Sequence, residues 1–125
     1  MPKLLVFCID ALCASDIEFM RTLPNFGQIL RHGALVEKVE PVFPALTYCC
    51  HTSILTGTYV GRHGIVHNEM LTRGGKRGAP WYSLKQQISG KTLLDEAREQ
   101  GLTTCSLAWP VSGAADYDFN MPMIV

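Results

Sequence analysis

A continuous run of apolar residues, 4–9, ends at the charged Asp10. Such a run is typical of a strand that is buried on both faces of a parallel sheet. Open α/β sheets bind their ligands at the carboxyl ends of the strands. The run therefore predicts a central strand of an α/β fold, with Asp10 at the edge where a functional site is expected.

Helix signals follow this strand. Ser15 and Glu18 have the spacing of a capping box, which predicts a short helix that extends to about Thr22. Pro24 suits the first turn of a second helix, and Gly33 is expected to end it.

Helical and extended patterns alternate along the rest of the chain. Residues 34–40 and 103–109 have β character, and a helix is expected from Thr47 to near Gly57. Residues 92–100 form an amphipathic pattern that predicts another helix. This alternation favours the α/β class.

Two segments are expected to be loops, 61–68 and 72–80. The second is rich in glycine, and we interpret it as a solvated excursion and not a phosphate-binding loop. Its glycines lack the spacing of a P-loop or of a dinucleotide-binding fingerprint.

Length and composition limit the partners and the compartment. The 125 residues suit one domain, and Lys plus Arg (11) balance Asp plus Glu (11). A net charge of zero favours neither nucleic acid nor a membrane surface as a partner. The five cysteines are an odd number, and the N-terminal apolar run is too short for a signal peptide or a membrane span. We therefore expect free thiols and a cytoplasmic protein.

Three residues are candidates for chemistry, each with an ordinary alternative. Asp10 is either a ligand for a divalent metal or a helix-capping group. Thr47 is either an N-cap or a nucleophile at a helix N-terminus, where N–H groups favour phosphate. Asn68, taken alone, is a turn residue.

Five motifs occur in order over nearly the whole chain. They are the strand that ends at Asp10, the Leu-Pro-Asn-Phe at 23–26, the Pro-Ala-Leu-Thr-Tyr-Cys-Cys-His-Thr at 44–52 with Thr-Gly at 56–57, the His-Gly-Ile at 63–65 with Asn68, and the Trp-Pro at 109–110. Together they resemble the nucleotide pyrophosphatase/phosphodiesterase branch of the alkaline phosphatase superfamily, in the manner of its intracellular bacterial members.

This resemblance implies a fold and a reaction. The fold is a three-layer α/β/α arrangement around a mostly parallel sheet, of which residues 1–125 form the N-terminal part. In that family Asp10 and Thr47 would be ligands of one of two divalent metal ions, usually zinc, and Thr47 would accept the phosphoryl group. Asn68 would bind a non-bridging phosphoryl oxygen, and the substrate would be a small phosphodiester or nucleotide. The metal would lower the pKa of a hydroxyl that is otherwise a poor nucleophile.

The chain departs from the family pattern in two ways. Cys49 replaces a proline that usually follows the nucleophile by two positions. The further metal ligands, an Asp-x-x-x-His pair, an Asp-His pair and a late His, are absent from 69–125. Two oxygen ligands from Asp10 and Thr47 do not meet the four-coordinate demand of Zn²⁺.

Other conspicuous side chains are expected to be structural. We interpret His51 and His63 as residues that bond loop backbone, and we disfavour Cys50 as a nucleophile. Trp81 and Tyr82 either stack on a base or return the chain to the core.

Two hypotheses of different classes remain. The chain is the N-terminal piece of a metal-dependent phosphodiesterase, inactive by itself, or it is a complete, non-catalytic anion-binding module. Within the enzyme class, phosphonoacetate hydrolysis is a third possibility, because it uses the same Thr and Asn. If the chain is a piece, its apolar strands lack neighbours, and we expect it to self-associate.

Overall fold

The computed structural model describes residues 3–74 and 79–123. The chain divides into two compact units, Met1–Glu40 and Pro41–Val125, and each is described by itself. Within the described ranges, no helix is both long enough and apolar enough to cross a membrane.

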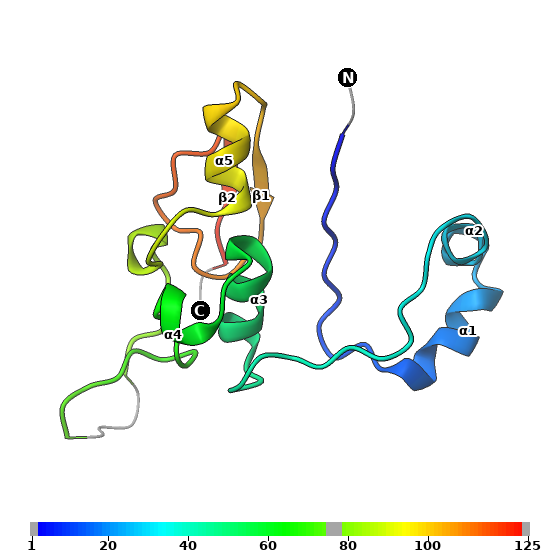
Figure 1. Ribbon diagram of the computed structural model, residues 1–125, viewed down its shortest axis with the longest axis horizontal. Coiled ribbons are helices and arrows are strands. Elements are labelled where there is room, and N and C mark those ends of the chain that lie inside the picture. The colour runs from blue at the N-terminus through cyan, green and yellow to red at the C-terminus, as the bar shows by residue number, and fades with distance from the viewer. Residues whose placement is uncertain (1–2, 75–78, 124–125) are drawn as a thin grey trace. The chain divides into compact units, whose positions relative to one another are not determined.

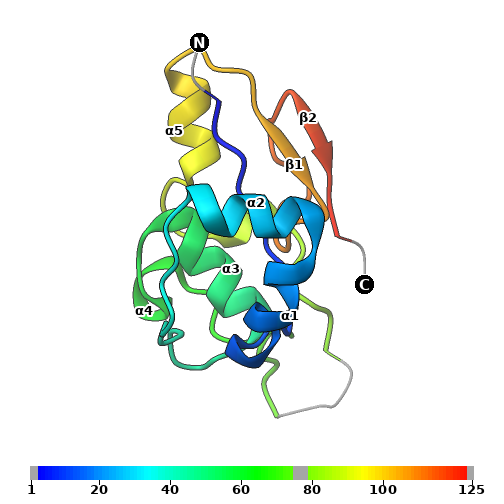
Figure 2. The same ribbon diagram turned by 90° about the vertical axis from the view of Figure 1, so that its right-hand side faces the viewer.

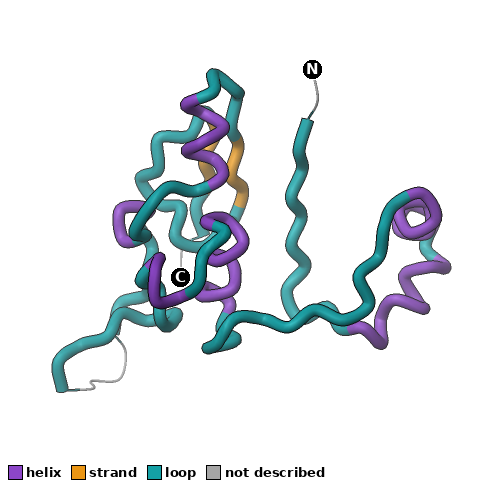
Figure 3. Tube along the Cα trace, viewed as in Figure 1, coloured by secondary structure: helices purple, strands orange, loops and turns teal. Residues whose placement is uncertain are grey.

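The first unit consists of an extended segment followed by short helices (Figures 1 and 3). A 3₁₀ turn, η1 (Ala14–Asp16), leads into α1 (Ile17–Thr22), and α2 (Pro24–His32) follows. Both helices predicted in this region are confirmed.

Residues 4–9 do not form the predicted strand. The segment is extended (Figure 3), but the structure assigns it no β-ladder, and large side chains such as Leu5 and Phe7 are exposed. The strand predicted over 34–40 is also absent. Both predictions are wrong for the same reason: a strand is made by hydrogen bonds to a neighbouring strand, and an apolar run does not supply that neighbour.

The first helical turn is capped two residues earlier than predicted. The Cys13 N–H donates to Asp16 Oδ2 at 2.8 Å, and the Asp16 N–H donates to the Cys13 carbonyl at 2.9 Å. Ser15 lies inside the 3₁₀ turn and so cannot cap it. Glu18 pairs instead with Arg21, at 3.2 Å between Oε1 and Nε.

Glycine allows α1 and α2 to pack closely (Figure 2). A Cβ at Gly27 would lie 2.6 Å from the carbonyl oxygen of Arg21, so no other residue fits without a shift of backbone. Gly33 ends α2 as predicted, with its N–H donating to the Ile29 carbonyl at 2.8 Å.

The second unit holds the remaining elements. They are α3 (Thr47–Thr56), α4 (Val60–His63), the 3₁₀ turn η2 (Lys85–Gln87), α5 (Leu93–Glu99), β1 (Cys105–Leu107) and β2 (Phe119–Met121). The predicted helices at 47–57 and 92–100 are confirmed as α3 and α5. The prediction of a loop over 61–68 is partly wrong, because α4 occupies its beginning. The core of this unit is formed by Tyr48, Ile65, Ile88 and Val111.

The sheet of the described chain has two parallel strands. Ser106 of β1 pairs in register with Asn120 of β2. The predicted extended segment 103–109 thus contributes three residues of strand, and β2 was not predicted, because Phe-Asn-Met shows neither a long apolar run nor a clear alternation. Helices combined with a parallel sheet confirm the α/β class.

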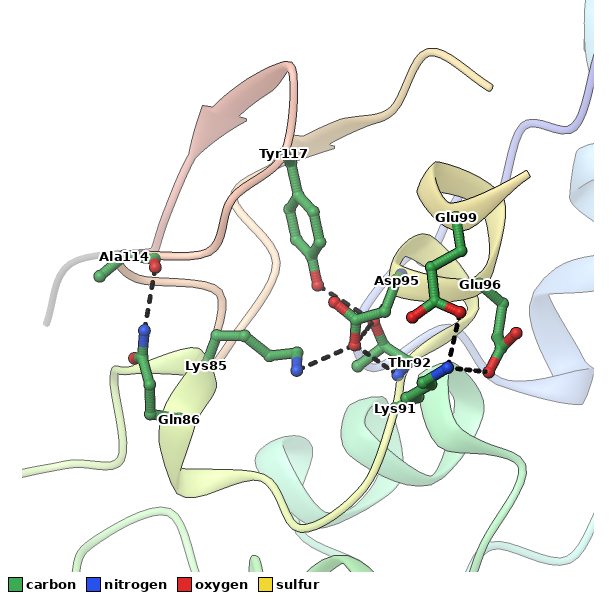
Figure 4. Close-up of polar contacts among 9 residues, drawn as sticks. All are labelled: Lys85, Gln86, Lys91, Thr92, Asp95, Glu96, Glu99, Ala114 and Tyr117. Atoms are coloured by element: carbon green, nitrogen blue, oxygen red, sulfur yellow. Dashed lines mark hydrogen bonds and ion pairs between the residues drawn. The ribbon is translucent and has the colours of Figure 1, made fainter. Parts of the chain in front are cut away.

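A polar network fixes the start of α5 (Figure 4). The Thr92 N–H donates to Asp95 Oδ2 at 2.7 Å, and the Asp95 N–H donates to Thr92 Oγ1 at 3.2 Å. Lys85 Nζ lies 2.8 Å from Asp95 Oδ2, and the Tyr117 hydroxyl lies 3.1 Å from Thr92 Oγ1. Burial opposes ionisation of Asp95, but the bonds from Lys85 and Thr92 outweigh it and hold the pKa of this carboxyl below its usual range.

Replacement of Thr92 by valine should destabilise the chain by about 1–2 kcal/mol, because it removes the helix cap and leaves the Tyr117 hydroxyl unpaired. Urea unfolding followed by circular dichroism measures this loss. Glu99→Gln is the matched control: it removes the exposed ion pair with Lys91 and should cost clearly less than Thr92→Val. Equal losses of stability in both variants would contradict the interpretation that Thr92 holds the start of α5 in place.

Candidate active site

Thr47 is the first residue of α3, and Leu46 occupies the N-cap position. The Leu46 side chain makes no capping hydrogen bond, and the Cys50 N–H donates to the Leu46 carbonyl at 2.9 Å. The N-cap interpretation of Thr47 is therefore wrong. Thr47 is half-buried and belongs to the first turn of α3, whose N–H groups have no carbonyl partners within the helix.

Asn68 contacts this same helix end. Its side-chain Oδ1 accepts a hydrogen bond from the Tyr48 backbone N–H at 3.1 Å. Because an N–H group requires an acceptor, this bond fixes the orientation of the amide and leaves Nδ2 as the donor on its other branch. The structure thus brings the surroundings of Thr47 and Asn68 together, from positions that are far apart in the sequence.

Backbone bonds hold Asn68 in place. Its carbonyl accepts from the Tyr82 N–H at 3.0 Å, and the Met70 N–H donates to the Pro80 carbonyl at 2.8 Å. These bonds close the base of the glycine-rich excursion predicted at 72–80. Residues 75–78 of that excursion lie outside the described residues, so its interpretation as a solvated loop stays a prediction.

An aromatic contact joins α3 to the residues that follow the glycine-rich excursion. The rings of Tyr48 and Trp81 meet edge to face, with centroids 5.3 Å apart and planes at 73°. Tyr48 is fully buried, and Trp81 and Tyr82 pack against the core. Burial raises the pKa of the Tyr48 phenol. Of the two roles considered for Trp81 and Tyr82, the structure shows the return to the core.

His51 lies one helical turn after Thr47 and bonds to its carbonyl. His51 Nδ1 is 2.7 Å from the Thr47 oxygen. Because a carbonyl only accepts, Nδ1 carries the proton. The imidazole also meets the Trp109 indole edge to face, with centroids 4.9 Å apart.

His63 is fully buried and joins α3 to α4. Its Nδ1 accepts from the Ile65 N–H at 3.1 Å, so Nε2 carries the proton and donates to Ser53 Oγ at 2.9 Å. Its carbonyl accepts from the Ser89 N–H at 2.9 Å. Burial lowers the pKa of this imidazole. His63 thus bonds loop backbone as predicted, whereas His51 bonds a carbonyl of its own helix.

Cys49, which replaces the expected proline, is fully buried in α3. Burial is the largest influence on its thiol and raises its pKa, so the side chain is a neutral packing group. Cys13, Cys49, Cys50 and Cys105 are free thiols, as expected.

Asp10 belongs to the first unit, whereas Thr47 and Asn68 belong to the second. Asp10 is exposed at a turn. Of the three candidate residues, Thr47 and Asn68 thus lie in one unit.

The described residues do not by themselves fit a metal pair. Among residues 3–74 and 79–123, no three His, Cys, Asp or Glu side chains gather in a way that could hold an ion. Asp118, one of the acidic residues of the tail, accepts from the Thr104 N–H at 2.7 Å and from its hydroxyl at 2.9 Å. It has a structural role, as Asp95 does.

Comparison with known proteins identifies the family. The family model described as type I phosphodiesterase / nucleotide pyrophosphatase matches residues 4–122. The chain belongs to this family. Its alkaline-phosphatase-like α/β fold is thereby confirmed. No solved structure matches the chain significantly.

The relatives are much longer proteins. A venom phosphodiesterase of Naja atra is 29% identical over 87% of this chain and 14% of its own length. The human ectonucleotide pyrophosphatase/phosphodiesterase family member 1 is 30% identical over 89% of this chain and 12% of its own length. The Bos taurus bis(5'-adenosyl)-triphosphatase ENPP4 is 39% identical over 61% of this chain and 17% of its own length. The chain thus spans a small part of each of these relatives.

Tyr48 is a residue of the site that the sequence did not lead us to expect. The backbone N–H of Tyr48 is the group that joins Asn68 to α3. Its position in the first turn was a signal, because first-turn N–H groups require partners from outside the helix.

The stability of the chain should depend on His63 in mild acid. The pKa of His63 lies below its usual value of 6.5 in the folded chain, so the unfolded chain takes up a proton first as the pH falls. The free energy of unfolding should therefore fall as the pH drops below about 6.5, until the folded imidazole titrates as well. In His63→Gln, which cannot titrate, the loss between pH 7.5 and pH 5.5 should be smaller.

Urea unfolding at the two pH values measures this difference. His67→Gln, which replaces an exposed imidazole, is the matched control for the substitution itself. If the His63→Gln variant and the native chain lose equal stability between pH 7.5 and pH 5.5, the buried neutral state of His63 is refuted.

Proposed function

We propose that this chain supplies the nucleophile and a phosphoryl-binding amide of a phosphodiesterase or nucleotide pyrophosphatase. Thr47 would be the nucleophile, and Asn68 would bind the phosphoryl group. The observation that carries the proposal is the 3.1 Å bond from the Tyr48 N–H to Asn68 Oδ1, because it sets the Asn68 amide at the start of the helix that Thr47 opens. Family membership supports the same assignment.

The local chemistry suits a phosphoryl group. The N-terminal end of α3 carries a partial positive charge and N–H groups that favour an anion. Asn68 Nδ2 can donate to a non-bridging oxygen, since Oδ1 is already engaged. Donors fixed in this way stabilise negative charge as it builds up on the phosphoryl oxygens.

The reaction then has two steps. The Thr47 oxygen bonds to phosphorus as the bond from phosphorus to the leaving oxygen breaks, and the hydroxyl proton passes to water. A water molecule later cleaves the bond between Oγ1 and phosphorus, which restores the Thr47 hydroxyl and releases the phosphate product.

The metal requirement belongs to the same proposal. We propose two divalent ions, zinc by preference, with Asp10 and Thr47 as two ligands and the others from outside these 125 residues. When bound, such ions act as Lewis acids toward phosphoryl oxygens.

The substrate proposed is a small phosphodiester or a nucleotide with a pyrophosphate linkage. The names of the relatives support this class: two are phosphodiesterases by name, and one is a bis(5'-adenosyl)-triphosphatase. Zero net charge supports a small molecule over nucleic acid or a membrane surface. Residues 1–125 would form the N-terminal part of one catalytic domain, and the free thiols support a cytoplasmic location.

Thr47→Ala tests the nucleophile in the intact protein that contains this chain. Turnover of a p-nitrophenyl phosphodiester should fall by about a thousandfold or more, because no other hydroxyl replaces Oγ1. Thr47→Ser should retain measurable turnover. Thr56→Ala, the same change at the other end of α3, is the matched control and should keep the native rate.

Several outcomes would count against the proposal. Native turnover in Thr47→Ala would remove Thr47 from the reaction. The 125-residue chain alone should give only background turnover with added Zn²⁺. Full activity of that chain would show that it needs no ligands from elsewhere.

We also propose that the isolated chain self-associates through its sheet. Leu107, Phe119 and Met121 lie on one face of β1 and β2 and are 65%, 63% and 58% exposed. Parallel sheets are normally covered on both faces, so this apolar face favours contact with a second chain.

Light scattering measures this association. Phe119→Lys should lower the average mass, because it places a charge on the apolar face. Leu71→Lys, at a loop residue that is 76% exposed, is the matched control and should leave the mass unchanged. A monodisperse monomer of the native chain would overturn the proposal.

A further inference from the structure

One peptide group, the one that joins Thr47 to Tyr48, is held at both ends by side chains. Its carbonyl oxygen lies 2.7 Å from His51 Nδ1, and its N–H lies 3.1 Å from Asn68 Oδ1. We propose that His51 is a positioning residue, which clamps this peptide and thereby sets the Asn68 amide relative to the Thr47 hydroxyl. The inference rests on the proposed function for its catalytic consequence, whereas the clamp itself can be tested without turnover.

The carbonyl end of the clamp is a directed bond. The Thr47 carbonyl is the ordinary helical acceptor for the backbone N–H of residue 51, and His51 adds a second donor from its ring. The ring cannot turn freely, since it meets Trp109 at a centroid distance of 4.9 Å. Trp109 is held in turn, because Ser112 Oγ donates to its carbonyl at 2.7 Å. The donor is therefore fixed by the loop that follows β1.

The N–H end of the clamp points to the proposed phosphoryl-binding group. A peptide is planar, so fixing its oxygen and its N–H fixes the whole plane. That plane determines the backbone torsion that follows the Thr47 Cα, and with it the placement of Asn68 relative to the Thr47 side chain. A donor on the carbonyl also polarises the peptide and strengthens the bond that its N–H makes.

The helix alone does not supply this constraint. Within a helix, the Tyr48 N–H has no carbonyl partner, because it belongs to the first turn. First turns also open more readily than the middle of a helix. Side chains on both sides of the peptide are therefore what keeps the site in one arrangement.

Two substitutions of His51 separate the clamp from general packing. Asparagine places its Nδ2 at the same bond distance from Cα as His51 Nδ1, so it can still donate to the Thr47 carbonyl. Glutamine places its Nε2 one bond further, which corresponds to the opposite ring nitrogen. Both variants lose the contact of the ring with Trp109, so a difference between them reports the hydrogen bond.

Hydrogen exchange of the Tyr48 amide in the full 125-residue chain measures the clamp directly. In His51→Gln, exchange should be about five to ten times faster than in the native chain, as expected for a weakened hydrogen bond. In His51→Asn it should stay within about twofold of native. The Thr56 amide, at the other end of α3, should be unchanged in both, which excludes global unfolding. His32→Asn, at an exposed position, is the control for the substitution itself.

The outcomes are decisive either way. Equal exchange of the Tyr48 amide in native, Asn and Gln chains overturns the clamp. Equally fast exchange in the Asn and Gln variants overturns it too, because the donor position then makes no difference. If either variant unfolds, nitrogen NMR of the native chain decides: a His51 proton on Nδ1 supports the clamp, and a neutral ring with the proton on Nε2 refutes it.

The catalytic consequence is measured in the intact protein. His51→Gln should lower kcat with little change in KM, and His51→Asn should restore most of it. A loss of turnover in Thr47→Ala without any difference between the His51 variants would support the proposed function and refute the clamp. Native turnover in Thr47→Ala would refute the proposed function, while hydrogen exchange would still decide on the clamp.

Discussion

The hydrogen bond between the Tyr48 N–H and Asn68 Oδ1 is the constraint around which the second unit is arranged. A helix that begins without a side-chain cap leaves polar groups that need partners. Here one partner comes from a loop twenty residues later, and that loop is held by its own backbone bonds. This helix end is thus supported by tertiary structure.

Aromatic contacts make this arrangement rigid. Tyr48 rests on Trp81 on one side of α3, and His51 rests on Trp109 further along the helix. Edge-to-face contacts have a preferred geometry, which an aliphatic core does not impose. Two such contacts on successive turns oppose both rotation and sliding of the helix. The mobile part of a phosphoryl-transfer site would then be the substrate and not the protein.

Local signals predicted α1, α2, α3 and α5, but they failed for two of the three expected extended segments. Pro24 and Gly57 mark helix ends by their own backbone preferences, and the structure agrees at both, whereas Gly33 ends α2 with an extended backbone that other residues also adopt. The residues at 4–9 carry an equally clear pattern, but a strand depends on a partner that no local pattern specifies. The order of the motifs identified Thr47 and Asn68 as candidates. The Tyr48 N–H was not identified, because a motif records side chains and not backbone groups. The metal ligands cannot be read from this chain, because the residues described here hold no such cluster.

The burial of Cys49 has a practical consequence. Its thiol lies in the first turn of α3, fully enclosed and beside the residues that define the site. A reagent that modifies thiols reaches this sulfur only when the turn opens. The rate at which Cys49 is modified therefore measures how often the turn opens. A thiol at the position where the family resemblance implies proline can therefore report on the opening of this turn.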